Sequence, residues 1–330
     1  MKKLIFIILT VALALVSCNK ADRLEGETAV LEFNVSIPGA VTKAEIGKGE
    51  LVDQLICAVF ENGVEIAELR ESITRTNGQF VYQPSLYVGK TYQIVFWAQN
   101  NGRYDTSDLT NITYKADRGY AANDETLDAF TLTQTVKLNK DKTVTVGTGE
   151  GAVTYTDGVS ATLKRPFTKL RVGSYFNDWD ENIKYSRVTF STIQTHFNAL
   201  TGDVVDGKTA SDKKYSAEIG DYTFTVKEVD EHGNEVEVKY QAVSFNYLLP
   251  GSVANITVEL AKEDFNSPDF DDDTDVVVVV TKDNVPSVGD NAILNLTGNI
   301  LKGDLKYTVS IDPSFDEPDA EDKDKHNIAL

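Results

Sequence analysis

The sequence predicts an all-β protein with two tandem β-sandwich domains, and three observations support this prediction. Short segments in which apolar and polar residues alternate recur along most of the chain, and turn residues separate them. No helical periodicity of useful length appears after residue 18. The 330 residues suit two domains, and a hydrophobic content of 41% is enough to form their cores.

The clearest alternation lies near the N-terminus and ends at Pro38-Gly39. Its apolar positions are Leu31, Phe33, Val35 and Ile37. A period of two predicts a strand with one buried face. Residues 51–69 read as strand, turn and strand, because the Asn62-Gly63 pair tolerates the positive φ angles of a tight hairpin.

Further segments with strand patterns follow in both halves of the chain. They are residues 90–99, 135–147, 184–193, 222–249, 253–260, 275–282, 291–301 and 305–311. Composition shifts after a Gly-, Thr- and Asp-rich stretch at residues 147–160. We therefore expect an N-terminal domain at residues 18–162 and a C-terminal domain with an acidic tail at residues 163–330.

Five consecutive valines, Val276–Val280, form the most apolar of these segments. An exposed edge strand of this composition would favour aggregation. Aspartates flank the run on both sides, as gatekeeper residues do. The pattern predicts a buried strand between charged loops.

The N-terminus has the layout of a secretory signal, with Lys2 and Lys3 before an apolar run at residues 4–16. The run is shorter than the ~20 residues that span a bilayer. It ends in Leu15-Val16-Ser17-Cys18, which resembles a bacterial lipobox. We expect residues 1–17 to be a lipoprotein signal peptide and Cys18 to be the lipidated first residue of the mature protein, with acyl chains as a stable anchor.

Composition excludes several classes of function. The formal net charge is −19 and no basic stripe is present, so nucleic acid is not an expected partner. Once Cys18 is lipidated, Cys57 is the only thiol left, and its apolar surroundings predict a core residue. The chain therefore has no intrachain disulfide to stabilise it.

The sequence contains no recognisable catalytic or cofactor motif. No nucleophile elbow, zinc-protease helix, phosphate-binding loop or C-x-x-C pair is present. We expect no catalytic residue, no metal and no cofactor. The acidic stretch Asp264–Asp275 reads as a solvated loop, with a calcium site as the alternative.

The two tryptophans are candidates for stacking on a ligand. Trp97 lies in an apolar strand and is expected in the core, whereas Trp179 lies among polar residues and is the better candidate for stacking on a sugar. A carbohydrate-binding lipoprotein is therefore the alternative function. A hydrolase would need clustered carboxylates, and nothing in the sequence identifies such a pair.

Several stretches, in order, resemble the fimbrillin-like (type V pilin) lipoproteins of Bacteroidetes, which include cell-adhesion proteins. They are "YQIVFWAQ", "YDTSDLT", "ANDETLDAFT", "LKRPFTKLRV" and "YTVSIDPSFD". The resemblance implies two transthyretin-like sandwich domains, no enzymatic activity, and an outer-membrane lipoprotein at the cell surface or in a fimbria. In polymerising members, a protease cuts after Arg or Lys in the loop that follows the first strand. That strand leaves, and a strand of the next subunit takes its place.

The resemblance assigns these roles to particular residues of this chain. The displaced strand is the one at residues 31–37, and Lys43 in "GAVTKAEIG" is the candidate cleavage site. Arg23 precedes the strand, and Arg70 and Arg75 lie too far into the domain. The candidate donor residues alternate near the C-terminus and are Leu305, Tyr307, Val309 and Ile311.

Two features depart from the pattern of a shaft subunit. An acidic tail follows the last strand, and the candidate cleavage residue is Lys43 rather than Arg. Either would suit a tip, accessory or anchor subunit, and the same strands could also be ordinary sheet members that never exchange. The expected partners are other pilin-like subunits, a processing protease and an unknown surface ligand.

Overall fold

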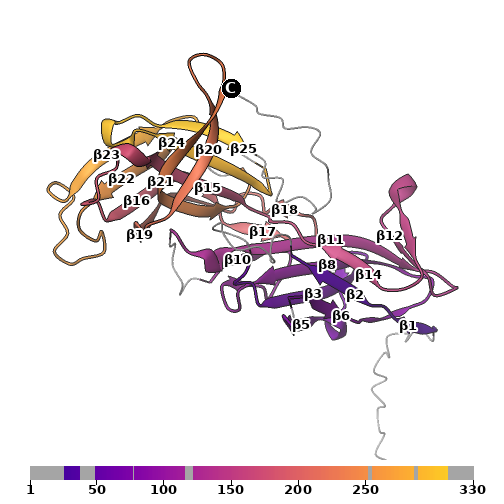
Figure 1. The fold of residues 1–330 in the computed structure, drawn as a ribbon. Coiled ribbons are helices and arrows are strands. Elements are labelled where there is room, and N and C mark those ends of the chain that lie inside the picture. The colour runs from indigo at the N-terminus through magenta and orange to yellow at the C-terminus, as the bar shows by residue number, and fades with distance from the viewer. Residues whose placement is uncertain are drawn as a thin grey trace, which may run out of the picture.

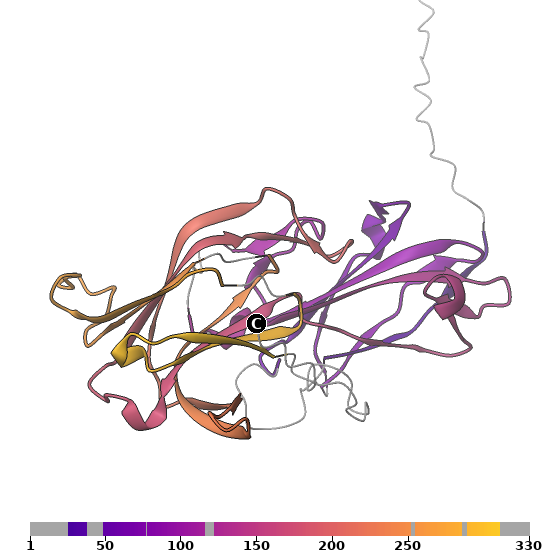
Figure 2. The ribbon, with the colours of Figure 1, turned by 90° about the horizontal axis from the view of Figure 1, so that it is seen from above.

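A computed structural model describes residues 26–37, 49–76, 78–115, 122–251, 255–285 and 289–310. These residues form strands with a few single-turn 3₁₀ helices, which confirms the predicted all-β sandwich class. Figures 1 and 2 show the N-terminal half, in indigo to magenta, beside the C-terminal half, in red to yellow. Within the described residues, no helix is long and apolar enough to cross a membrane.

The elements before residue 163 are β1 (Thr28–Val30), β2 (Phe33–Ser36), β3 (Gln54–Glu61), β4 (Val64–Glu65), η1 (Ala67–Leu69), β5 (Glu71–Thr74), β6 (Phe80–Tyr82), β7 (Ser85–Tyr87), β8 (Thr91–Gln99), β9 (Tyr104–Asp105), β10 (Ile112–Tyr114), η3 (Glu125–Leu127), β11 (Ala129–Leu138), β12 (Val144–Val146), η4 (Gly149–Gly151), β13 (Val153–Tyr155) and β14 (Val159–Thr162).

The elements after residue 163 are β15 (Thr168–Tyr175), η5 (Phe176–Asp178), β16 (Tyr185–Gln194), β17 (His196–Asn198), β18 (Asp203–Val204), β19 (Thr209–Glu218), β20 (Thr223–Val229), β21 (Glu235–Leu248), β22 (Ile256–Ala261), β23 (Val276–Lys282), β24 (Ala292–Gly298), η6 (Ile300–Lys302) and β25 (Lys306–Ser310).

The N-terminal half is a sandwich of two sheets around one apolar core. The larger sheet has the order β13-β12-β11-β8-β3-β4, with β5 also on β3, and the smaller has the order β14-β2-β6. The core takes Phe33 and Val35 from the smaller sheet and Cys57 and Phe96 from the larger one. The short strands β1 and β7 pair beside it.

The C-terminal half repeats this arrangement with different strands. One sheet has the order β20-β21-β15-β24-β25, and the other has the order β19-β16-β22-β23. Apolar residues of both sheets form a second core, among them Leu170, Val188, Val258 and Leu296.

Several local predictions are confirmed. Residues 54–65 form a hairpin whose turn residues Asn62 and Gly63 have φ angles of 53° and 79°. The Cys57 and Trp97 side chains are fully buried. Burial raises the pKa of the Cys57 thiol well above its ordinary value, so this thiol stays neutral and unreactive.

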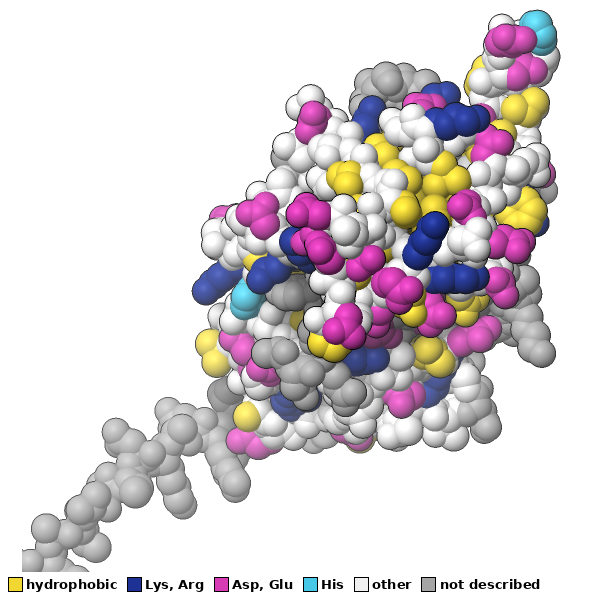
Figure 3. Space-filling model, turned by 90° about the vertical axis from the view of Figure 1, so that its left-hand side faces the viewer, with side chains coloured by type: hydrophobic (Ala, Val, Ile, Leu, Met, Phe, Trp, Pro, Cys, Tyr) yellow, Lys and Arg dark blue, Asp and Glu magenta, His cyan; other side chains and the backbone are white. Residues whose placement is uncertain are grey.

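The prediction of a buried strand at Val276–Val280 is wrong. These residues begin β23, which is the edge strand of its sheet. Val280 is buried in the core, but Val277 and Val279 are 45% and 61% exposed among the described residues. Figure 3 faces the side of the molecule on which β22 and β23 lie, and it shows hydrophobic side chains grouped among charged ones.

The two halves are joined by a shared sheet and a third apolar core. β10 of the first half pairs with β17 of the second in the order β18-β17-β10-β9. The third core contains Trp97 and Tyr104 from the first half and Phe167 and Phe197 from beyond residue 163. The predicted boundary at residues 162/163 stays a prediction.

Buried charges also lie at this junction. Arg165 donates two hydrogen bonds of 2.7 Å to the carboxylate of Asp128, and both side chains are buried. The Arg165 guanidinium also lies 4.5 Å from the centre of the Phe130 ring. Lys169 is buried as well, 3.9 Å from the carboxylate of Glu125.

Replacing Asp128 with Ala should destabilise the protein strongly, because the Arg165 charge would remain buried without its carboxylate. We expect a loss of about 3–5 kcal/mol in the free energy of unfolding, measured by urea denaturation. Glu27→Ala is the matched control, since it breaks the exposed 2.8 Å pair with Lys142 and should cost less than about 1 kcal/mol. Equal losses for the two variants would contradict this account of the junction.

Lys169 should make stability depend on alkaline pH. Burial lowers the pKa of its ammonium from 10.5 to about 8, against the opposing attraction of Glu125. Between these values the unfolded chain binds more protons than the folded one, so the contribution of Lys169 to stability rises with pH.

We expect the wild type to gain up to about 3 kcal/mol relative to Lys169→Met between pH 8 and pH 10.5, measured by denaturant unfolding at each pH. Lys142→Met, at an exposed lysine, is the control and should show no such difference from the wild type. Parallel pH profiles for the wild type and Lys169→Met would rule out this role of Lys169.

Candidate functional site

The candidate site is the place that β2 occupies in the N-terminal sandwich. β2 is the central strand of its three-stranded sheet, antiparallel to β6 and parallel to β14. It brings together residues far apart in sequence, with Phe33 opposite both Tyr82 and Val159. Removing β2 would therefore open two strand edges at once.

One face of this segment is buried as predicted. Leu31, Phe33, Val35 and Ile37 all lie in the first core. The Phe33 ring centre lies 5.6 Å from that of Phe96 and 6.2 Å from that of Tyr82. Since Phe96 belongs to the opposite sheet, Phe33 connects the two layers of the sandwich.

Backbone hydrogen bonds continue the pairing beyond the ends of β2. The amide of Leu31 donates to the carbonyl of Pro84 at 3.0 Å. The carbonyls of Glu32 and Ser36 accept from the amides of Val159 and Leu163 at 2.8 and 3.0 Å. Without β2, these buried groups would need new partners.

The predicted cleavage site Lys43 and the lipidation site Cys18 lie outside the described residues. The chain after the candidate cleavage loop, residues 39–47, is held by hydrogen bonds that do not involve β2. Arg75 donates to the carbonyls of Gly49 and Val52, both at 3.2 Å. The segment from Gly49 onward therefore keeps this anchor if residues before it leave.

Arg70 is also engaged in the fold. Arg70 donates to both carboxylate oxygens of Glu65, at 2.8 and 2.9 Å, and also to the carbonyl of Thr106. These bonds hold Arg70 at the start of β5. An arginine held by these bonds is a poor substrate for the active site of a protease.

The predicted donor segment forms β25 at an edge of its sheet. It is antiparallel to β24, with Tyr307 opposite Leu296 and Val309 opposite Leu294. Leu305 is buried in the second core, and Ile311 lies outside the described residues. An edge strand can leave its sheet by breaking one ladder of hydrogen bonds, whereas a central strand must break two.

Trp179 is a poor stacking platform in this structure. It follows η5, is half-buried, and packs against the second core. Because part of its ring already faces protein, less of it is available to stack on a sugar. Its position does not favour the carbohydrate-binding alternative.

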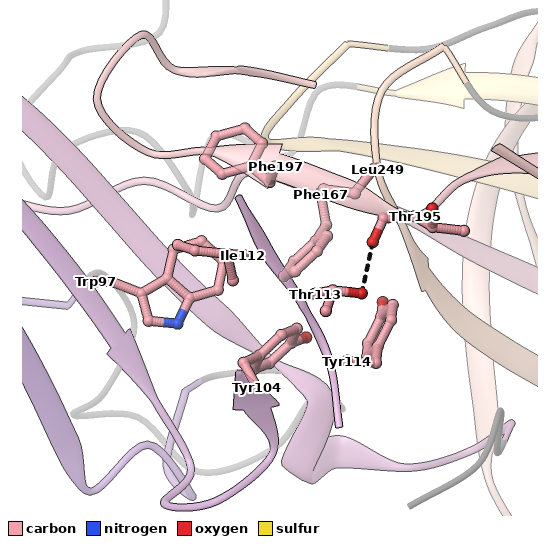
Figure 4. A pocket seen from close by; sticks show the side chains of 9 residues that line it. All are labelled: Trp97, Tyr104, Ile112, Thr113, Tyr114, Phe167, Thr195, Phe197 and Leu249. Atoms are coloured by element: carbon pink, nitrogen blue, oxygen red, sulfur yellow. Dashed lines mark hydrogen bonds between the residues drawn. The ribbon is translucent and has the colours of Figure 1, made fainter. Parts of the chain in front are cut away.

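An aromatic pocket lies at the junction of the two halves (Figure 4). Trp97 and Tyr104 pack edge to face with ring centres 5.3 Å apart, and Phe167 stacks on Tyr104 at 6.0 Å. The hydroxyl of Thr113 donates to the carbonyl of Thr195 at 3.0 Å. Rings fill this region, so it serves as a packed joint rather than a ligand site.

The described residues offer no group of three or more His, Cys, Asp or Glu side chains able to hold a metal ion. In the acidic loop predicted as solvated, aspartates bind the backbone of the loop itself. The carboxylates of Asp264, Asp271 and Asp275 accept from the amides of Asn266, Asp273 and Asp271, respectively.

The sequence of residues 23–329 matches the family of unknown function DUF6562. The chain belongs to this family. No curated protein matches the sequence.

Solved structures of similar topology come from three bacteria. One is assigned to cell adhesion in Bacteroides ovatus, with 13% identity, a TM-score of 0.47, and coverage of 86% of this chain and 96% of that chain. The fimbrial anchor protein Mfa2 from Porphyromonas gingivalis has 12% identity, a TM-score of 0.40, and coverage of 85% and 96%. A fimbrial assembly protein from Parabacteroides distasonis has 12% identity, a TM-score of 0.44, and coverage of 87% and 97%.

In this DUF6562 protein, sequence patterns did not reveal the second partner of β2. The parallel partner β14 lies more than 120 residues away, and "GVSAT" has only a short alternation. The buried charges at the junction were also missed. Their signal is Arg165 just before β15 and Lys169 within it, which are cations beside the buried residues Leu170 and Val172.

Phe33→Ala should show how strongly the first core depends on β2. Phe33 is fully buried and contacts rings of both sheets, so we expect a loss of about 3–5 kcal/mol in the free energy of unfolding. Asn34→Ala on the same strand is the matched control, because Asn34 is only half-buried and should cost less than about 1 kcal/mol. Chemical denaturation measures both, and similar losses would contradict a dominant role for Phe33.

Proposed function

We propose that this DUF6562 protein is a non-enzymatic lipoprotein of the outer membrane that acts as a fimbrial or cell-adhesion subunit. Its mature chain would have two sandwich domains, residues 18–162 and 163–330, with lipid on Cys18. It would assemble by strand addition after proteolysis at Lys43 releases the first strand. Its partners would be pilin-like subunits, and neither a cofactor nor a metal takes part.

The observation that carries this proposal is the position of β2 in the N-terminal half. A segment near the N-terminus supplies the central strand of a sheet, and the predicted cut loop follows it directly. Its four inward side chains are buried in the core. Cleavage at Lys43 would separate β2, together with β1 before it, from the rest of the domain, and Lys43 lies within no described strand.

The energetics favour replacement rather than a permanently empty groove. Burying each of the side chains Leu31, Phe33, Val35 and Ile37 contributes about 1.5–3 kcal/mol, so the four together contribute roughly 6–12 kcal/mol. This is comparable to the whole stability of a domain, about 5–15 kcal/mol. A domain that has lost β2 therefore gains substantially by binding an alternating strand of another subunit.

The C-terminal segment fits the role of donor because of its place in the fold. β25 pairs with β24 on one side only and is the last strand described. Its sequence alternates apolar residues at Leu305, Tyr307 and Val309, as β2 does at Phe33 and Val35. It can therefore offer one apolar face to a groove built for such a face.

Limited trypsin treatment of the lipid-free chain tests this proposal. We expect a cut at Lys43, followed by ladders or filaments that grow with protein concentration in size-exclusion chromatography and negative-stain imaging. Lys43→Gln should prevent both, whereas Lys48→Gln, a matched change just after the candidate cleavage loop, should leave both intact. N-terminal sequencing identifies the bond that is cut.

A chain cut at Lys43 that remains a monomer would contradict strand addition. So would filaments that form equally well from uncut Lys43→Gln protein. Resistance of the Lys43 bond to trypsin, together with cleavage elsewhere, would remove Lys43 as the processing site.

A further inference from the structure

Besides the position of β2, a second candidate site for pairing with a partner strand is β23, in the C-terminal half. It pairs with β22 along one side, and no described strand lies on the other. Within the described part of the chain, no backbone hydrogen bond outside that pairing involves residues 276–281. An edge with free amide and carbonyl groups is a template for another strand.

β23 has few of the devices that normally protect an edge. It contains no proline, and its only charged residue is Lys282, at its end. One irregularity, opposite Leu260 and Ala261, leaves Val277 without a partner on β22. From Val278 to Lys282 the register is regular, so the open edge stays straight enough to pair.

The outer face of this edge is apolar. Val277 and Val279 are 45% and 61% exposed. The rings of Phe265 and Phe270 pack against each other with centres 4.8 Å apart in the loop that leads into β23. Figure 3 shows hydrophobic side chains gathered on this side of the molecule, with both acidic and basic side chains around them.

The charge around this edge is strongly negative. Residues 269–275 contain five aspartates, and Asp283 follows the strand. Only Asp272 among them has an ion pair with a described residue, at 2.6 Å from Arg187. A partner with basic residues at the ends of its strand would therefore be attracted to both ends of β23.

We propose that β23 is a docking edge for an extended segment of another protein, in which apolar residues alternate and Lys or Arg residues flank the strand. The partner's backbone would pair with the open side of β23. Its apolar side chains would cover Val277 and Val279. Its basic ends would lie beside the aspartates at residues 269–275 and at Asp283.

A second copy of this chain fits the edge poorly. Each copy carries a formal charge of −19. Antiparallel self-pairing centred on Val279 would also place Asp275 of one copy opposite Asp283 of the other, and like charges directly opposite each other are destabilising. A basic strand avoids both penalties.

This edge is separate from the groove of the proposed function. β2 belongs to the sheet β14-β2-β6, whereas β23 belongs to β19-β16-β22-β23 in the other half. Docking at β23 requires neither cleavage nor loss of β2. Failure of either proposal therefore leaves the other untouched.

Fluorescence anisotropy with two labelled peptides tests the docking edge on the intact, uncut chain. The probe peptide is "KKTVTVTVKK", and the matched peptide "EETVTVTVEE" carries the opposite charge. We expect the basic peptide to bind, the acidic peptide to bind at least about tenfold more weakly, and binding of the basic peptide to weaken as salt rises.

The double variant Val277→Lys and Val279→Lys should weaken binding of the basic peptide at least about tenfold, because it adds like charge and removes the apolar face. Val64→Lys on β4 is the control, since Val64 is 70% exposed on a strand of only two residues and should have no effect. Val279→Thr keeps a β-branched residue and should weaken binding less than the double variant. Circular dichroism of each variant confirms that the fold is retained.

Four results would overturn the proposal. The basic peptide could fail to bind the wild-type chain, or both peptides could bind with equal affinity. The double variant could also bind as the wild type does. If sedimentation showed a wild-type dimer that the double variant abolishes, the edge would belong to a second copy and not to a basic partner.

Discussion

The N-terminal sandwich depends on one short strand, β2, which precedes both of its sheet neighbours in the chain. β2 lies between β6 and β14, and these two strands have no pairing with each other without it. Its inward residues also connect the smaller sheet to the larger one, through contacts such as Phe33 with Phe96. The sheet β14-β2-β6 is therefore complete only while an alternating apolar strand occupies its centre, whichever chain supplies that strand.

Contacts at the junction hold the N-terminal sandwich against the C-terminal half. The pairing of β10 with β17, the aromatic packing around Trp97, and the buried pair of Arg165 with Asp128 all join residues on either side of position 163. None of these contacts involves β2 or β25. Loss of a strand at either end of the molecule would therefore leave these contacts intact.

Local sequence patterns predicted much of the fold, and their failures have physical causes. Alternation identified the buried face of residues 31–37, and the Asn62-Gly63 pair identified a hairpin, because both signals depend on neighbours in sequence. The parallel pairing of β2 with β14 could not be predicted, since it depends on contacts across more than 120 residues. The valines of β23 were misjudged because composition does not distinguish an edge strand from a central one. The roles of Lys43 and Cys18 stay predictions, because both residues lie outside the described part of the chain.

Strand complementation tests the central claim most directly. The chain would be cut at Lys43, the released N-terminal segment would be removed in denaturant, and the remainder would be refolded with or without a synthetic peptide of residues 303–312. We expect the peptide to restore a cooperative thermal transition, and a peptide with Lys in place of Leu305, Tyr307 and Val309 to fail. A remainder that folds equally well without any peptide would contradict the claim that this sheet requires a strand at the position of β2.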